Sequence, residues 1–185
     1  MLSIALHQLS QQLESIELSN IMIGPELFWP EDASKSTSTP LWPRLITFDL
    51  NYQPATSSGE WLFESDPAWV DKFAEPESPS ESAKDCNRFR IIPNQHIDDI
   101  YLAAGSAAQN MPRLSRMRLE ARIGIDLMHE PYPEPTHAFE YNATLGKATW
   151  VSSSEFHIAD DVRRAWDIVA KNHGHVEICA EVCYY

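Results

Sequence analysis

Three short segments place acidic and basic side chains at matching positions, and the chemistry of these side chains is the first indication of function. The segments are residues 13–18 (LESIEL), 45–50 (LITFDL) and 114–119 (LSRMRL), which share the pattern L-x-x-φ-x-L with a large apolar residue at φ. If they form neighbouring parallel strands in register, their outward-facing side chains line up in rows. The middle row is Glu17, Asp49 and Arg118; the row before it is Ser15, Thr47 and Arg116; the row after it is Ser19, Asn51 and Glu120.

An acid–acid–arginine row flanked by hydroxyl and amide side chains is compatible with three roles. As a recognition surface, it offers mixed polar contacts to a partner. The binding residues are then Glu17, Asp49, Asn51, Arg116, Arg118 and Glu120. In an enzyme, Asp49 is the candidate for proton transfer and Arg118 the candidate for holding an anionic intermediate. In the third role, the row is an ordinary solvated face with weak ion pairs.

The remaining reactive side chains do not form a recognisable catalytic or metal-binding motif. His96 precedes two aspartates at the start of a predicted helix, where helix capping explains the acids better than catalysis does. His173 and His175 follow a predicted helix end, without the three or four converging ligands that a metal needs. The 3 cysteines lack CxxC spacing and are expected to be thiols. No G-x-S-x-G turn or glycine-rich phosphate loop is present, so we expect neither metal nor cofactor.

Helices and strands that alternate along the chain must position these rows. Leucines at 2, 6, 9 and 13 have the spacing of an amphipathic helix before the first segment. Residues 94–110 predict a second helix, with Asn94 as its N-cap, before the third segment. Within each segment, φ and the last leucine face the core, so Leu18, Leu50 and Leu119 should be equivalent buried residues. This order predicts an α/β fold, a short leucine-rich-repeat-like solenoid.

The C-terminal part has a different pattern, which predicts a cap for the solenoid. Residues 139–141 and 148–151 alternate on either side of a turn, as in a β-hairpin. Residues 160–171 begin with acids, carry an apolar stripe that includes Trp166, and are followed by Gly174 as a stop, which predicts a helix. Residues 176–182 predict a final strand. We expect Trp166 to pack against the hairpin.

We expect a single domain over residues 1–185. Its repeat-like region spans residues 1–128, and its hairpin–helix–strand cap spans residues 138–185. Residues 31–40 and 75–85 are polar and are expected to be mobile loops, because they have little apolar surface to bury. The proline-rich residues 129–137 are expected to form an extended connector between the two parts.

The charge balance excludes some classes of partner. Asp and Glu number 27 against 14 Lys and Arg, a net charge of −13, which argues against nucleic acid or a membrane surface as a partner. The sequence has no apolar run of the roughly 18 residues of a membrane span, and no signal peptide. We therefore expect a soluble, cytoplasmic protein whose oligomeric state the sequence leaves open.

Several short motifs, in their order and spacing, carry a family resemblance. They are residues 26–30 (ELFWP), 42–45 (WPRL), 58–61 (SGEW), 101–104 (YLAA), 111–114 (MPRL) and 141–150 with the later pair 165–166 (AW). Nearly the whole chain resembles the C-terminal, leucine-rich-repeat-like region of fungal F-box proteins. The resemblance implies a repeat fold with a recognition surface for a target. We expect that the F-box, the adaptor segment of that family, is missing, because the chain starts at its first repeat helix.

Two functional hypotheses follow. The first is a non-catalytic module, derived from the substrate-binding region of an F-box protein, that binds a protein target or a small-molecule ligand. The second is a cofactor-independent cyclase or isomerase of fungal secondary metabolism, which would act on a reactive small molecule in an apolar pocket. A deep apolar pocket with a buried charge would favour the enzyme, and a flat polar face would favour the module.

Overall fold

The structure of the protein is a computed structural model, in which residue 10 and residues 12–28, 41–67, 90–123 and 136–184 are described. Several sequence-based predictions lie outside these residues. They are the helix over the first leucines, the loops at 31–40 and 75–85, and most of the 129–137 connector.

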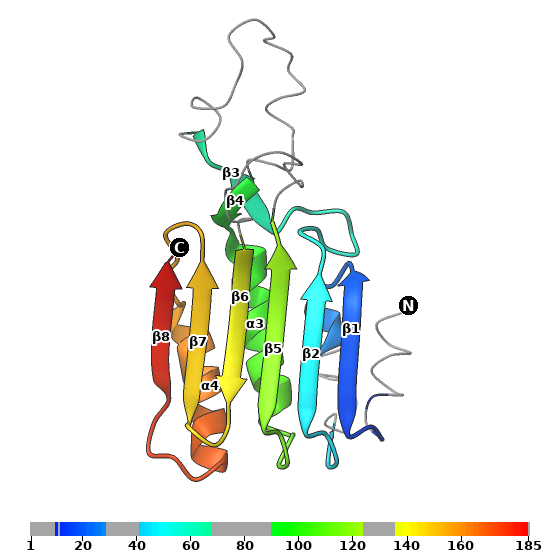
Figure 1. Cartoon of the computed structure of the whole chain (residues 1–185), viewed down its shortest axis with the longest axis vertical. Coiled ribbons are helices and arrows are strands. Elements are labelled where there is room, and N and C mark those ends of the chain that lie inside the picture. Colours follow the sequence, from blue (N-terminus) through cyan, green and yellow to red (C-terminus); the bar gives the residue numbers. More distant parts are fainter. Residues whose placement is uncertain (1–9, 11, 29–40, 68–89, 124–135, 185) are drawn as a thin grey trace, which may run out of the picture.

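One six-stranded sheet organises the molecule, with the strand order β1-β2-β5-β6-β7-β8 (Figure 1). Its strands are β1 (Ser15–Ile21), β2 (Thr47–Tyr52), β5 (Arg116–Arg122), β6 (Thr136–Asn142), β7 (Lys147–Ser152) and β8 (Cys179–Tyr184). Beyond one end of the sheet, β3 (Phe63–Ser65) pairs with β4 (Arg90–Pro93) in a separate antiparallel ladder.

The strands of the three repeated segments are parallel and in the predicted register. Leu18 of β1 pairs with Leu50 of β2, and Leu50 pairs with Leu119 of β5. Leu50 and Leu119 are fully buried, whereas Leu18 is only partly buried against the core. The difference arises because β1 is the edge strand, so that Leu18 has a neighbouring strand on one side only.

The predicted hairpin is present, but it continues the sheet instead of forming a separate cap. β6 runs antiparallel to β5 and β7 antiparallel to β6, and β8 returns parallel to β7. The physical reason is that Phe139 and Tyr141 pair with Leu119 and Met117 of β5 and extend the same buried face. The fold is therefore mixed α/β with one mixed sheet, and a leucine-rich-repeat solenoid is not shown by the described residues.

In the described part of the chain, two helices cover one face of this sheet: α3 (Gln95–Ala108) and α4 (Asp160–Asn172) (Figure 1). The side-chain oxygen of Asn94 accepts a hydrogen bond from the His96 backbone N–H at 3.0 Å, which confirms the predicted N-cap. The two helices approach closely at Gly105, where an added Cβ would lie 3.1 Å from the side chains of both Ala165 and Trp166. A short 3-10 turn, η1 (Pro25–Leu27), lies beside α3.

The core between helices and sheet is rich in aromatic rings. Trp166 is fully buried, and its ring centroid lies 4.5 Å from Phe139 and 5.2 Å from Tyr141. Its indole Nε1–H donates to the Tyr101 carbonyl at 3.2 Å. This confirms the prediction that Trp166 packs against the hairpin, and it ties both helices to β6.

The end of α4 follows the sequence prediction, and the final strand begins later than predicted. Gly174 has a positive φ of 91°, the left-handed conformation that lets the chain turn out of the helix. β8 starts at Cys179, and Val176 is 88% exposed. Among the described residues, no helix has the length and apolar character that a membrane crossing requires.

Candidate functional site: the open face of the sheet

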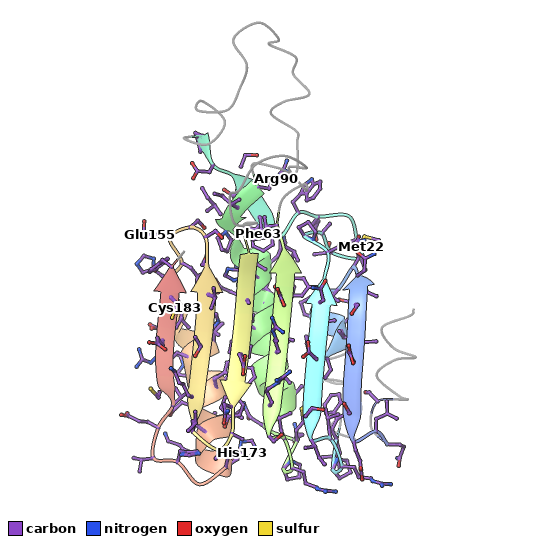
Figure 2. All side chains as sticks on the ribbon, viewed as in Figure 1. Met22, Phe63, Arg90, Glu155, His173 and Cys183 are labelled. Atoms are coloured by element: carbon purple, nitrogen blue, oxygen red, sulfur yellow. The ribbon has the colours of Figure 1, made fainter. Side chains whose placement is uncertain are left out.

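The side of the sheet opposite α3 and α4 carries the predicted rows, and we call it the open face (Figure 2). Because side chains alternate along a strand, every second residue points to this face. Register extends each predicted row across all six strands. The rows are Ser15, Thr47, Arg116, Asn142, Lys147 and Cys179; Glu17, Asp49, Arg118, Glu140, Thr149 and Glu181; and Ser19, Asn51, Glu120, Ala138, Val151 and Cys183.

The backbone places Asp49 between Glu17 and Arg118 as predicted, but the ion pairs do not follow the row. Arg116 Nη2 lies 2.8 Å from Asp49 Oδ2, and Arg118 Nη2 lies 2.6 Å from Glu120 Oε2. The cation that supports Asp49 is therefore Arg116, and not Arg118. Long arginine side chains reach diagonal and same-strand neighbours as readily as the residue directly opposite, and strand register does not decide between them.

The predicted catalytic pair is open to solvent. The Asp49 side chain is 34% exposed and the Arg118 side chain 41% exposed. Ion pairs at this exposure contribute under about 1 kcal/mol each to stability, because water screens both charges. The environment of Asp49 and Arg118 is that of a solvent-exposed surface contact.

Among the described side chains of the open face, the cations Arg116, Arg118 and Lys147 are each paired with a neighbouring acid, whereas two acids are left over. Besides Arg116 and Arg118, Lys147 Nζ lies 2.6 Å from Glu181 Oε2, and this hydrogen bond holds the pKa of Lys147 above its ordinary value. Among the described residues, no ion pair reaches Glu17 or Glu140. The open face thus has an excess of negative charge.

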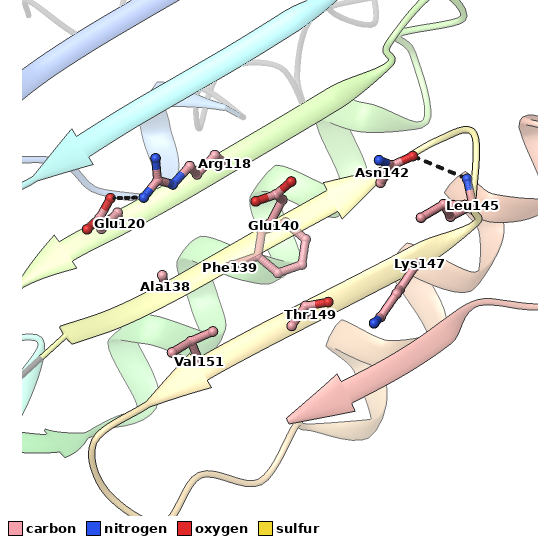
Figure 3. Close-up of a pocket in the computed structure, with 10 residues that line it drawn as sticks. All are labelled: Arg118, Glu120, Ala138, Phe139, Glu140, Asn142, Leu145, Lys147, Thr149 and Val151. Atoms are coloured by element: carbon pink, nitrogen blue, oxygen red, sulfur yellow. Dashed lines mark hydrogen bonds and ion pairs between the residues drawn. The ribbon is translucent and has the colours of Figure 1, made fainter. Parts of the chain in front are cut away.

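An open trough of about 380 Å³ runs over β5, β6 and β7 on this face (Figure 3). Its lining residues are Arg118, Glu120, Ala138, Phe139, Glu140, Asn142, Leu145, Lys147, Thr149 and Val151. Glu140 lies in the middle of the trough, between Arg118 and its register partner Thr149. The Asn142 side chain accepts a hydrogen bond from the Leu145 N–H at 3.2 Å and so orders the turn at one end.

A second pocket, of about 260 Å³, is mainly apolar and lies beside β1. Ile16, Phe28 and Phe48 are among its lining residues, and Glu17, which is exposed, is the one charged residue among the described residues that line it. It therefore has the apolar walls, but not the buried charge, that the enzyme hypothesis requires. Within the described residues, no three metal-ligating side chains come together in a group.

Sequence reasoning missed a buried polar cluster in the core, formed by His137, Ser152, Tyr52 and Tyr101. His137 is 0% exposed, and its Nδ1 is hydrogen-bonded to Ser152 Oγ at 3.2 Å. Burial lowers the pKa of His137 to about 3, so its imidazole is neutral at neutral pH. The sequence contained a signal for this burial, because His137 precedes Phe139 and Tyr141 at the two-residue spacing of one strand face.

The tyrosines of this cluster also stay uncharged. Burial raises the pKa of both Tyr52 and Tyr101 above the ordinary value. A neutral imidazole beside phenols can in principle exchange protons with a substrate. However, His137 and Tyr101 are both 0% exposed, and the rings of Phe63 and Phe156 pack on His137 with centroids 5.6 and 4.9 Å away. The cluster is therefore a polar part of the core.

The family comparison covers the half of the chain that contains the trough. The model of a family of unknown function, DUF6546, matches residues 86–183, and the chain belongs to this family. All lining residues of the trough lie inside the matched region, whereas Glu17 and Asp49 lie before it. No curated protein and no solved structure matches the chain.

Proposed function

We propose that the protein is a non-catalytic recognition module that binds a protein partner through the open face of its sheet. The observation that carries the proposal is the division of the sheet into two different faces. One face packs against α3 and α4, and the other presents three rows of mostly polar side chains across six strands. A broad face with mixed charges suits the polar contacts of a protein interface.

A protein partner fits this face better than a small molecule does. Small-molecule sites enclose most of the ligand surface in a concave, mainly apolar cavity. The trough over β5, β6 and β7 is open, and the charged residues Arg118, Glu120, Glu140 and Lys147 line it together with apolar surface. A protein surface can span it and also reach the ion pairs on the neighbouring strands.

The competing hypothesis of a cyclase or isomerase has less support from the geometry. Its candidate residues, Asp49 and Arg118, lie on the solvent side of the sheet and form separate ion pairs with Arg116 and Glu120. Among the described residues, Arg118 lines the trough, whereas Asp49 lines neither the trough nor the pocket beside β1. The origin of the module in the substrate-binding region of fungal F-box proteins is a further part of the proposal, and it rests on the sequence resemblance.

The proposal is tested with two variants on the open face and one on the helix side. Proteins that co-purify with the wild-type chain are identified by mass spectrometry, and the affinity of each purified candidate is measured by calorimetry. Asp49→Asn and Arg118→Ala should each weaken binding about five-fold or more. Arg164→Ala, an exposed change on α4, should leave the affinity unchanged.

The same variants separate binding from stability. Because the ion pairs of Asp49 and Arg118 are exposed, losing one should cost under about 1 kcal/mol, which lowers the melting temperature by no more than about 4 °C in a chain of this size. The proposal is wrong if both open-face variants bind every purified partner as wild type does. It is also wrong if Arg164→Ala is the variant that weakens binding.

A further inference from the structure

We propose that the trough receives a basic side chain, an arginine or lysine of the partner protein, and that the Glu140 carboxylate is its acceptor. This inference rests on the proposed function, since it names the chemistry of the contact that a partner makes with the open face. It follows from the ion pairs around the trough, its apolar surface and the charge of the chain.

Among the described residues, no ion pair reaches Glu140, although two cations border the trough. Arg118 is the residue directly opposite Glu140 in the β5–β6 ladder, yet its guanidinium binds Glu120 at 2.6 Å. Lys147, on the other side, binds Glu181 of β8 at 2.6 Å. Both cations are thus held by acids on the sides away from Glu140. Figure 3 shows the carboxylate in the middle of the trough, with no dashed contact to any neighbour drawn.

An exposed carboxylate that is surrounded by satisfied ion pairs is suited to an incoming cation. A guanidinium can donate two parallel hydrogen bonds to one carboxylate, and a lysine ammonium binds it as a compact positive charge with three N–H donors. Thr149 of β7 is the register partner of Glu140, and its side-chain hydroxyl adds a second acceptor beside the carboxylate. Neither Arg118 nor Lys147 has to give up its own partner for the new pair to form.

The apolar part of the trough fits the stem of a basic side chain. Ala138 and Val151 are register partners in the next row, so they form an apolar step beside Glu140. Lysine and arginine side chains lay their methylene groups on apolar surface and keep the charged end in a polar environment. Leu145, 63% exposed at the turn, extends the apolar contact at the other end of the trough.

The charge of the whole chain favours the same partner. A net charge of −13 attracts basic segments at long range and repels acidic ones. An anionic ligand would have to displace Glu120 from Arg118 or Glu181 from Lys147, and it would then lie against the unpaired Glu140. A basic segment meets neither obstacle, so the observations favour a cation.

Three fluorescent octapeptides test the inference with the 185-residue chain: (Arg-Ser)₄, (Lys-Ser)₄ and (Glu-Ser)₄. Their affinities are measured by fluorescence polarisation in 150 mM salt. We expect at least one basic peptide to bind and the acidic peptide not to bind. Glu140→Gln should weaken the basic peptide at least five-fold. The matched control Glu64→Gln removes the same charge from the exposed side of β3 and should change the affinity less than two-fold.

The possible failures are distinct. Equal weakening by Glu140→Gln and Glu64→Gln would show general charge attraction and overturn the Glu140 site. Failure of both basic peptides to bind, or tighter binding of (Glu-Ser)₄, would overturn it as well. If the Asp49 and Arg118 variants still weaken a purified partner in those cases, the recognition module stands and only the basic contact is wrong. A charge reversal, Glu140→Arg, should abolish binding of the basic peptides while the melting temperature confirms that the variant is folded.

Discussion

Replacing His137 by phenylalanine should change how the stability of the protein depends on pH. In the folded chain the imidazole is fully buried beside Phe63, Tyr101 and Phe156, and burial lowers its pKa from 6.5 to about 3. The phenylalanine ring keeps these aromatic contacts and cannot bind a proton. Ser152 Oγ loses the imidazole but still accepts from the Ser154 N–H at 3.4 Å.

The sign of the effect follows from where the proton binds. Between pH 6.5 and 3 the unfolded chain binds a proton at His137 and the folded chain does not, so acid stabilises the unfolded state. Above pH 6.5 the neutral His137 does not lower the free energy of unfolding, and below pH 6.5 this free energy falls as the pH falls. With the pKa of His137 lowered from 6.5 to about 3, linkage predicts a loss of about 2 kcal/mol between pH 8 and pH 5.

Urea denaturation of the wild type and His137→Phe at pH 8, 7, 6 and 5 measures this difference. Groups that titrate alike in both proteins cancel, so the gap between their free energies of unfolding should shift by about 2 kcal/mol in favour of the variant at pH 5. A gap that stays constant within about 0.5 kcal/mol would refute the reasoning. If the variant does not fold, an NMR titration of the wild-type imidazole gives the same test, and a pKa near 6.5 would refute it.

Three further predictions concern stability. Burial and the charges of Asp161 and Asp99 raise the pKa of Asp98 to about 6. Because the charged carboxylate is disfavoured in the folded state, Asp98→Asn should raise the melting temperature at pH 8 and lose this advantage by pH 4. An equal change in melting temperature at both pH values would contradict this prediction. Trp166→Ala should cost about 3 to 5 kcal/mol in urea denaturation, and solvent-like fluorescence of native Trp166 would count against its burial. Leu50→Ala should cost about 2 to 5 kcal/mol and Leu18→Ala clearly less, since Leu18 is at the sheet edge; equal losses would be inconsistent with this position.

Local pattern was sufficient to predict most of the elements. The L-x-x-φ-x-L frame predicted the register of β1, β2 and β5 residue by residue, because strand side chains alternate with a period of two and aligning the frames puts φ and the last leucine of every segment on the same face. The Asn94 cap, the hairpin and the α4 helix also depend on neighbouring residues, and they were confirmed.

The assembly of these elements was not contained in the local pattern. A hairpin that buries one face can cover an edge or continue a sheet, and its sequence is the same in both cases. The structure decides for continuation, because Phe139 and Tyr141 meet the buried face of β5 and the rings of Trp166 and Tyr101 close over it.

The candidate site divides in the same way between sequence and tertiary structure. Which polar residues share a face, including Glu17, Asp49 and Arg118, could be predicted from the sequence, since strand alternation and register decide this. The folded sheet was needed to show that Arg116 holds Asp49 and that, among the described residues, no ion pair reaches Glu140 beside Arg118. The physical reason is that ion pairs depend on side-chain reach and on strands that come together only in the folded sheet. The same holds for His137, whose neutral state depends on rings from β3, α3 and the segment after β7.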